Sequence, residues 1–273
     1  MVSSNSSWRV IGASVRGTGH IRSGRGCDDA HAIRLQDGGL LFLAVADGAG
    51  SAAYSATGAS TAVRVALDTA ELLLNGQQQP AQEDQWLSVL RMILQSAHEA
   101  VHQLVLDEIV PTQDIPQERL QQYQLDGKRT LRDFATTLLV AIVTPDWIAT
   151  VQVGDGAIVL QQVDGSFTSL TPHSRNEYVN ETDFITRADY LSAADFTVLS
   201  RGGMRGIGLL TDGLQIVAMK MPQNTPSEPF FTPLFRTIAQ STVTEDALRR
   251  FLESERICTR TDDDKTLILA VSL

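Results

Sequence analysis

The stretch from Leu40 to Gly48, which reads LLFLAVADG, decides how the rest of the sequence is interpreted. A short run of seven apolar residues between turn-forming segments is typical of a buried β-strand. The run stops at Asp47, and the glycine after it lets the backbone turn sharply or bring its own carbonyl group to a cation. The sequence therefore predicts a strand that presents a carboxylate at its end.

Other acidic residues flank predicted strands in the same way. Carboxylates at the ends of strands can converge at one edge of a sheet, and a cluster of carboxylate oxygens suits hard cations such as Mg²⁺ or Mn²⁺ better than zinc. Asp-Gly is also a common turn dipeptide, and we interpret Asp37-Gly38 and Asp164-Gly165 as turns of this kind. The remaining acidic positions are Asp28, Asp29, Asp155, Asp212 and the run Asp262 to Asp264.

The order of the predicted elements defines the fold class. Helices are expected over 51–74, 83–109 and 244–253, from apolar residues at helical spacing and from stop signals. Alternating strand and helix units, which mark a parallel sheet, are absent. We therefore expect one α+β domain over residues 1–273, with two packed antiparallel sheets flanked by helices. The predicted strands cover 8–15, 30–35, 40–46, 138–143, 147–153, 157–163, 167–170, 196–199, 206–210 and 266–271.

The composition excludes several classes of partner. The chain has 273 residues, of which 43% are hydrophobic, and a formal net charge of -10. That charge argues against nucleic acid or an anionic membrane surface as a partner, since both attract basic proteins. Two cysteines are too few for a disulfide framework, and no signal peptide or membrane-spanning run is visible. The expectation is a soluble, cytoplasmic protein, with a monomer as the default.

Short motifs around the aspartates carry a resemblance to a known family. In this order they resemble the type-2C protein phosphatases, which are metal-dependent serine/threonine phosphatases, across almost the whole chain. The segment 176–186 resembles the bacterial branch of that family. The motifs are Gly26-Cys27-Asp28-Asp29-Ala30-His31, Val45-Ala46-Asp47-Gly48-Ala49-Gly50, Ala135-Thr136-Thr137-Leu138, Val153-Gly154-Asp155-Gly156, Leu210-Thr211-Asp212-Gly213 and Asp263-Asp264-Lys265-Thr266-Leu267.

The resemblance implies an α-β-β-α sandwich and a centre with two Mn²⁺ or Mg²⁺ ions. It implies that Asp47 bridges the two ions, with the Gly48 carbonyl on one of them. Asp212 and Asp263 would complete the protein ligands of the second ion. Asp155, together with Asp212, would hold a third and weaker ion.

The resemblance also implies how the reaction proceeds. Asp28 and Asp29 would act through metal-bound waters, and Asp29 is our candidate for orienting or shuttling a proton. Two cations can activate a bridging water and neutralise the phosphoryl oxygens, so that hydrolysis needs no protein nucleophile. The implied substrate is a phosphoserine or phosphothreonine protein, in a signalling role opposite a serine/threonine kinase.

One departure from the family concerns the substrate phosphate. Many members carry an arginine four residues before the first acidic residue, and here that position is Gly24. Arg22, Arg25 and His20 are the candidates to replace it. A family flap would correspond to 171–200, and the polar segment 111–132 is expected to be a surface loop.

Two alternatives remain open at the level of the sequence. One is a catalytically weak or inactive phosphatase fold that serves as a regulatory or binding module, which the missing arginine favours and the full set of aspartates opposes. The other is a metal-dependent hydrolase of small phosphomonoesters, since the same chemistry would serve it.

Overall fold

Two five-stranded antiparallel sheets form the centre of the chain. The computed structural model describes residues 8–76, 79–106, 129–171, 182–221, 223–240 and 243–273. The first sheet has the order β1 (Trp8–Val15), β12 (Lys265–Ser272), β9 (Met204–Leu210), β6 (Ala157–Gln162) and β7 (Phe167–Ser169). The second has the order β2 (Ala30–Gln36), β3 (Leu40–Ala46), β4 (Leu138–Val143), β5 (Trp147–Val153) and β8 (Asp195–Ser200).

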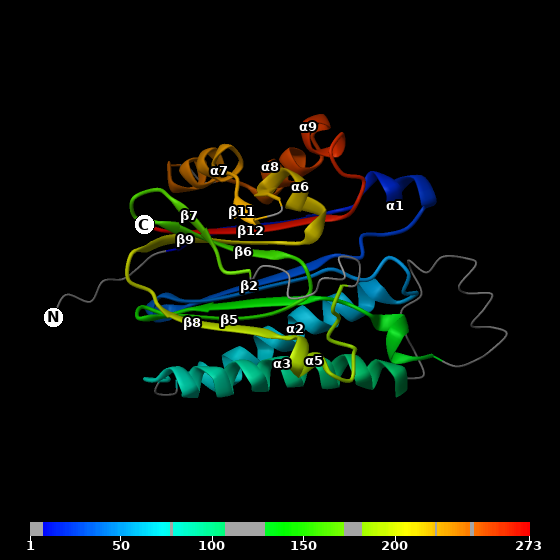
Figure 1. Cartoon of the computed structure of the whole chain (residues 1–273), viewed down its shortest axis with the longest axis horizontal. Helices are drawn as coiled ribbons and strands as arrows, with labels where there is room; N and C mark the ends of the chain where they lie inside the picture. The colour runs from blue at the N-terminus through cyan, green and yellow to red at the C-terminus, as the bar shows by residue number, and fades with distance from the viewer. Residues whose placement is uncertain (1–7, 77–78, 107–128, 172–181, 222, 241–242) are drawn as a thin grey trace.

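Helices cover the outer faces of both sheets, so that the molecule has four layers (Figure 1). The second sheet is covered by α2 (Ser55–Leu74) and α3 (Glu83–Leu106). The first is covered by α6 (Gln215–Ala218), α7 (Glu228–Gln240), α8 (Glu245–Leu252) and α9 (Glu255–Cys258). The smaller elements are α1 (Thr18–Ser23), α5 (Tyr190–Ala193), β10 (Met219–Lys220), β11 (Thr225–Pro226), η1 (Asp37–Gly39), η2 (Leu131–Phe134) and η3 (Asp212–Leu214).

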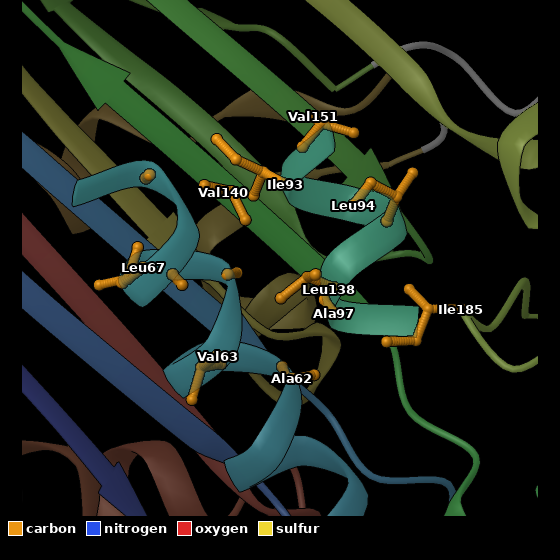
Figure 2. Close-up of a cluster of buried hydrophobic side chains, with 14 of the residues drawn as sticks. Ala62, Val63, Leu67, Ile93, Leu94, Ala97, Leu138, Val140, Val151 and Ile185 are labelled. Carbon is orange, nitrogen blue, oxygen red and sulfur yellow. The ribbon is translucent and has the colours of Figure 1, made fainter. Parts of the chain in front are cut away.

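Strand β3 contributes to two separate cores because its side chains alternate between the faces of its sheet. Phe42 and Ala44 pack toward α2 and α3, whereas Leu41 and Leu43 pack between the two sheets. All four are fully buried. Figure 2 shows the helix-facing core, in which side chains of α2 and α3 meet Val140 of β4. The apolar run from Leu40 to Ala46 is therefore an interior strand buried on both faces.

The ends of the strands that carry acidic residues meet at one end of the sandwich. In the second sheet, Ala30 pairs with Ala46, so the segment before β2 and the segment after β3 leave the sheet side by side. In the first sheet, β9 ends where β6 and β12 begin. The antiparallel registers thus bring distant acidic segments together without any parallel crossover.

The predicted fold class is confirmed, and the predicted elements differ from the structure in a few places. Helix α2 begins at Ser55 rather than at residue 51, because the segment before it turns back through a hydrogen bond from the Ala52 amide to the Ala49 carbonyl. Helix α7 was not predicted, since prolines at 226, 229 and 233 interrupt a segment whose apolar residues nevertheless face the first sheet. Pro233 lies inside the helix.

Several predicted segments fall partly outside the described residues. Helix α3 ends at Leu106, and the rest of its predicted range, to 109, is not described, nor is most of the surface loop predicted over 111–132. Of the flap predicted over 171–200, residues 172–181 are not described, and 195–200 form β8, an edge strand paired with β5. No helix among the described residues is long and apolar enough to cross a membrane.

Candidate metal centre

Asp47 is held at the end of β3 by two threonines that precede β4. The Asp47 amide donates to the Thr137 hydroxyl at 2.8 Å, and the Asp47 carbonyl accepts from the Thr137 amide at 2.8 Å and from the Thr136 hydroxyl at 3.0 Å. At Gly48, a Cβ atom would lie 2.7 Å from the Asp28 carbonyl oxygen. A side chain there would therefore push apart the two acidic segments, which explains the glycine.

Asp29 links the two sheets. It is 8% exposed, and its Oδ2 atom accepts from the hydroxyls of Thr211 and Thr266, each at 2.8 Å. Thr211 follows β9 and Thr266 lies in β12, both on the opposite sheet from Asp29. The Asp29 Oδ1 atom is buried and has no hydrogen-bond partner among the described residues. One oxygen is thus fixed by hydroxyls while the other is free to bind a ligand.

Burial and mutual repulsion raise the pKa values of the central carboxyls. Burial, with the charges of Asp29 and Asp212, raises the pKa of Asp47 to about 12. Burial, with the charge of Asp264, raises the pKa of Asp29 to about 8. Burial, with the charge of Asp155, raises the pKa of Asp212 to about 6. Without cations, burial and the neighbouring negative charges therefore favour the protonated forms of these three carboxyls.

Asp155 and Asp263 lie around Asp212, and their charges raise its pKa. Asp155 Oδ2 accepts from the Thr182 hydroxyl at 2.7 Å, and Asp155 Oδ1 is buried with no hydrogen-bond partner among the described residues. Asp263 is exposed. Its Oδ1 atom accepts from the Asp264 amide at 2.9 Å. The five aspartates expected as ligands or catalytic groups thus lie at one end of the sandwich.

Asp264 was not predicted as a site residue, although it holds the site together. It is 2% exposed, and its carboxylate accepts from the amides of Gly17 and Asp28, each at 2.5 Å, and from His20 Nδ1 at 2.9 Å. Thr211 and Thr266 were missed as well. Their signal in the sequence is their place beside the aspartates, within the motifs Leu210-Thr211-Asp212-Gly213 and Asp263-Asp264-Lys265-Thr266-Leu267.

The three candidates for binding the substrate phosphate have different surroundings. Arg22 pairs with Asp262 at 2.8 Å on the open surface, with both side chains more than two-thirds exposed. His20 is bound to Asp264. Arg25 is 15% exposed, pairs with Asp28 and donates to the Gly50 carbonyl, while its Nε atom is buried without a hydrogen-bond partner among the described residues.

The donor set fits divalent cations. Two buried carboxylate oxygens lack hydrogen bonds within the described part of the chain, and the neighbouring carboxyls repel one another. Bound cations would give these oxygens a partner and remove the repulsion. No three acidic, histidine or cysteine side chains within the described ranges are already arranged as a metal cage. Mg²⁺ commonly takes one or two carboxylates and keeps several waters, so it needs no complete protein cage.

Fold and site together define a class of protein: a helix-flanked double sheet with a carboxylate cluster suited to hard cations at one end. Comparison with known proteins gives the family. Residues 16–253 match the family described as protein phosphatase 2C. Serine/threonine-protein phosphatase 3 of Escherichia coli (strain K12) is 33% identical, over 97% of this chain and 98% of that protein. The chain belongs to the protein phosphatase 2C family.

Solved structures agree with this fold. The serine/threonine phosphatase Stp1 from Staphylococcus aureus has a TM-score of 0.62 and 14% identity, covering 98% of this chain and 96% of that one. The catalytic domain of the serine threonine protein phosphatase PstP, in complex with two manganese ions, has a TM-score of 0.55 and 17% identity, covering 97% and 98%. The predicted sandwich and the predicted bacterial type-2C protein phosphatase are confirmed.

Proposed function

We propose that this protein phosphatase hydrolyses phosphoserine and phosphothreonine in proteins, with divalent cations bound by the aspartate cluster. The observation that carries the proposal is the buried cluster of carboxyls around Asp47, in which Asp29 and Asp155 each have a buried oxygen without a hydrogen-bond partner among the described residues. Two Mn²⁺ or Mg²⁺ ions, when bound, supply a water of lowered pKa and neutralise charge on the phosphoryl group. The relatives named as serine/threonine phosphatases support the substrate class.

The ligand roles follow the positions of the carboxyls. Asp47 would contact both ions, because it lies near both Asp29 and Asp212, whose charges act on its carboxyl. Asp212 and Asp263 would hold one ion, and Asp155, with its free Oδ1, would serve a third and weaker one. The Gly48 carbonyl would complete the set. Cations held there would favour the ionised forms of these carboxyls.

Two residues would act on the substrate and the attacking water. Asp29 is tied by two hydroxyls through one oxygen, so its other oxygen keeps a fixed direction from which it would orient a water or take up a proton. Arg25 would bind the substrate phosphate in place of the arginine that many family members carry at the position of Gly24. A buried Nε atom without a hydrogen-bond partner supports Arg25 over the exposed Arg22.

The experiment that tests this proposal is hydrolysis of a phosphothreonine peptide, a phosphoserine peptide and p-nitrophenyl phosphate in Mn²⁺, Mg²⁺ or EDTA. We expect turnover with either metal, none in EDTA, and a higher kcat/KM for the peptides. Equal kcat/KM for p-nitrophenyl phosphate and the peptides would indicate a small-molecule phosphomonoesterase. No turnover from folded, metal-loaded protein would indicate a regulatory module, and in the cell the expected opposing enzyme is a serine/threonine kinase.

A further inference from the structure

A groove of about 400 Å³ is lined by residues of α6, α7, α8 and α9. These helices lie on the outer side of the first sheet (Figure 1). That volume lies in the range of pockets that hold ligands and peptide side chains. Ile216 in its wall is 61% exposed, so its side chain is available to an occupant of the groove. The apolar walls are formed by Ile216, Val217, Phe230, Leu234, Phe251 and Ile257.

The groove and the candidate metal centre lie on two sides of one short helix. Asp212 begins η3, and α6 follows without a break. The first residue of α6, Gln215, donates a hydrogen bond through Nε2 to the carbonyl of Asp155. The next two residues, Ile216 and Val217, line the groove. A chain segment seated in the groove would therefore leave its neighbouring residues close to the carboxylate cluster.

The charge of the groove differs from that of the whole protein. Its lining includes Arg256 and Arg260 and no acidic residue, in a chain with a net charge of -10. Both guanidinium groups are exposed, and neither has an ion-pair or hydrogen-bond partner within the ranges that the structure describes. An occupant that combines an apolar side chain with carboxylates would pack against the apolar walls and pair with Arg256 and Arg260.

From this complementarity, and resting on the proposed function, we infer that the groove docks an acidic, apolar segment of the phosphoprotein substrate. Docking of this kind adds affinity for the substrate without a new contact at the phosphate, because the tethered phosphoresidue then binds at a high effective concentration. It also gives a protein phosphatase a way to select proteins by sequence remote from the phosphorylated residue. The candidate metal centre then needs to recognise only the phosphate group of the substrate.

Two pairs of synthetic peptides test the docking site. All contain the same phosphothreonine core, joined to a flexible Gly-Ser linker of about ten residues. One member of each pair ends in a tail of Asp, Glu, Leu and Phe, and the other in a tail of Ser and Gly. The linker and tail stand before the core in one pair and after it in the other. We expect about tenfold lower KM, at equal kcat, for the acidic apolar tail in at least one orientation.

The matched variants separate the groove from general charge. Arg256→Glu with Arg260→Glu, and separately Ile216→Asp, should abolish the difference in KM between the two tails. Arg236→Glu with Arg250→Glu makes the same change of charge on exposed positions outside the groove lining and should leave the difference intact. All variants should hydrolyse p-nitrophenyl phosphate as the wild type does, which also shows that they are folded.

The outcomes are distinct from those that test the metal centre. If the wild type does not hydrolyse p-nitrophenyl phosphate, the proposed function is contradicted. If peptides with the acidic apolar tail and with the Ser-Gly tail have equal KM values, only the docking inference is overturned. A free tail peptide that changes kcat for p-nitrophenyl phosphate, without lowering KM when tethered, would make the groove a regulatory site and the docking inference wrong.

Discussion

The carboxylate of Asp264 accepts the backbone amide of Asp28 at 2.5 Å, across 236 positions of sequence. The residue just before β12 of the first sheet thereby fixes the segment that leads into β2 of the second sheet. Through the same carboxylate, Gly17 and His20 hold the start of α1 to this place. The spacing between the two sheets at the candidate metal centre thus depends on one buried side chain.

Replacement of Asp264 by alanine should therefore affect both stability and activity. It leaves two buried amides and the partly buried His20 ring without their acceptor, so we expect a loss of about 3 kcal/mol in the free energy of unfolding. Urea unfolding in EDTA measures this. The control is Asp262→Ala, which removes an exposed ion pair with Arg22 and should cost less than about 0.5 kcal/mol. Equal effects of the two variants would contradict the role assigned to Asp264.

The threonine hydroxyls that donate to Asp29 can be removed while the Asp29 carboxyl stays in place. Thr211→Val and Thr266→Val each remove one donor to Asp29 Oδ2 and keep the shape of the side chain. We expect kcat for a phosphothreonine peptide to fall about tenfold in each, or about 1.4 kcal/mol, because Asp29 loses its fixed orientation. Thr211→Ser keeps the hydroxyl and should recover most of the rate. A serine variant as slow as the valine variant would argue against orientation by this hydrogen bond.

The metal-free protein should lose stability as the pH rises. The pKa values of Asp29 and Asp47 lie near 8 and 12 in the folded chain, against about 4 for an unfolded aspartate. Above about pH 4 the folded protein therefore holds protons that the unfolded chain has released, and the free energy of unfolding falls with rising pH. We expect the Tm in EDTA to decrease between pH 5 and 8, by about 2 to 4 °C for each kcal/mol lost.

The same argument predicts that Asp47→Asn stabilises the metal-free protein at pH 8, since it removes the carboxyl that must keep a proton. Mn²⁺ should raise the Tm of the wild type and have little effect on this variant. Thermal unfolding of both proteins with and without Mn²⁺ checks both points. A variant less stable than the wild type in EDTA would contradict the electrostatic account of the cluster.

Much of the fold was predictable because its signals are local. Apolar runs and turn residues identified the strands, and glycines beside Asp47 and Asp212 marked the acidic strand ends. Helix α7 was missed because prolines that normally stop helices lie at its start and inside it. Which aspartates meet depends on the register of the strands within each sheet and on how the two sheets pack. No short-range sequence pattern gives either.

The supporting residues of the site were beyond the sequence for the same reason. Asp264 and Thr266 serve the site through partners more than 200 positions away. Lys265, between them, is fully buried, and its Nζ atom donates to the Asp263 carbonyl at 2.9 Å. The sequence gives no signal of this burial, since lysines are rarely buried.

Lys265 gives a further prediction. Lys265→Met removes the donor that fixes the Asp263 segment, so we expect about tenfold weaker binding of Mn²⁺, as for other losses of support behind a metal ligand. Calorimetric titration of the metal-free protein measures it. Lys220→Met changes an exposed lysine and should leave the affinity unchanged. Wild-type affinity in the Lys265 variant would show that the Asp263 segment is held by other contacts.

The most direct test of the central claim is hydrolysis of a phosphothreonine peptide in Mn²⁺ by the wild type, Asp47→Asn and Asp212→Asn. If the carboxylate cluster holds the catalytic cations, the wild type turns over, and each variant loses at least about a hundredfold in kcat/KM while remaining folded. Wild-type rates in Asp47→Asn would contradict the account, because the carboxyl on which the charges of both Asp29 and Asp212 act would then be dispensable.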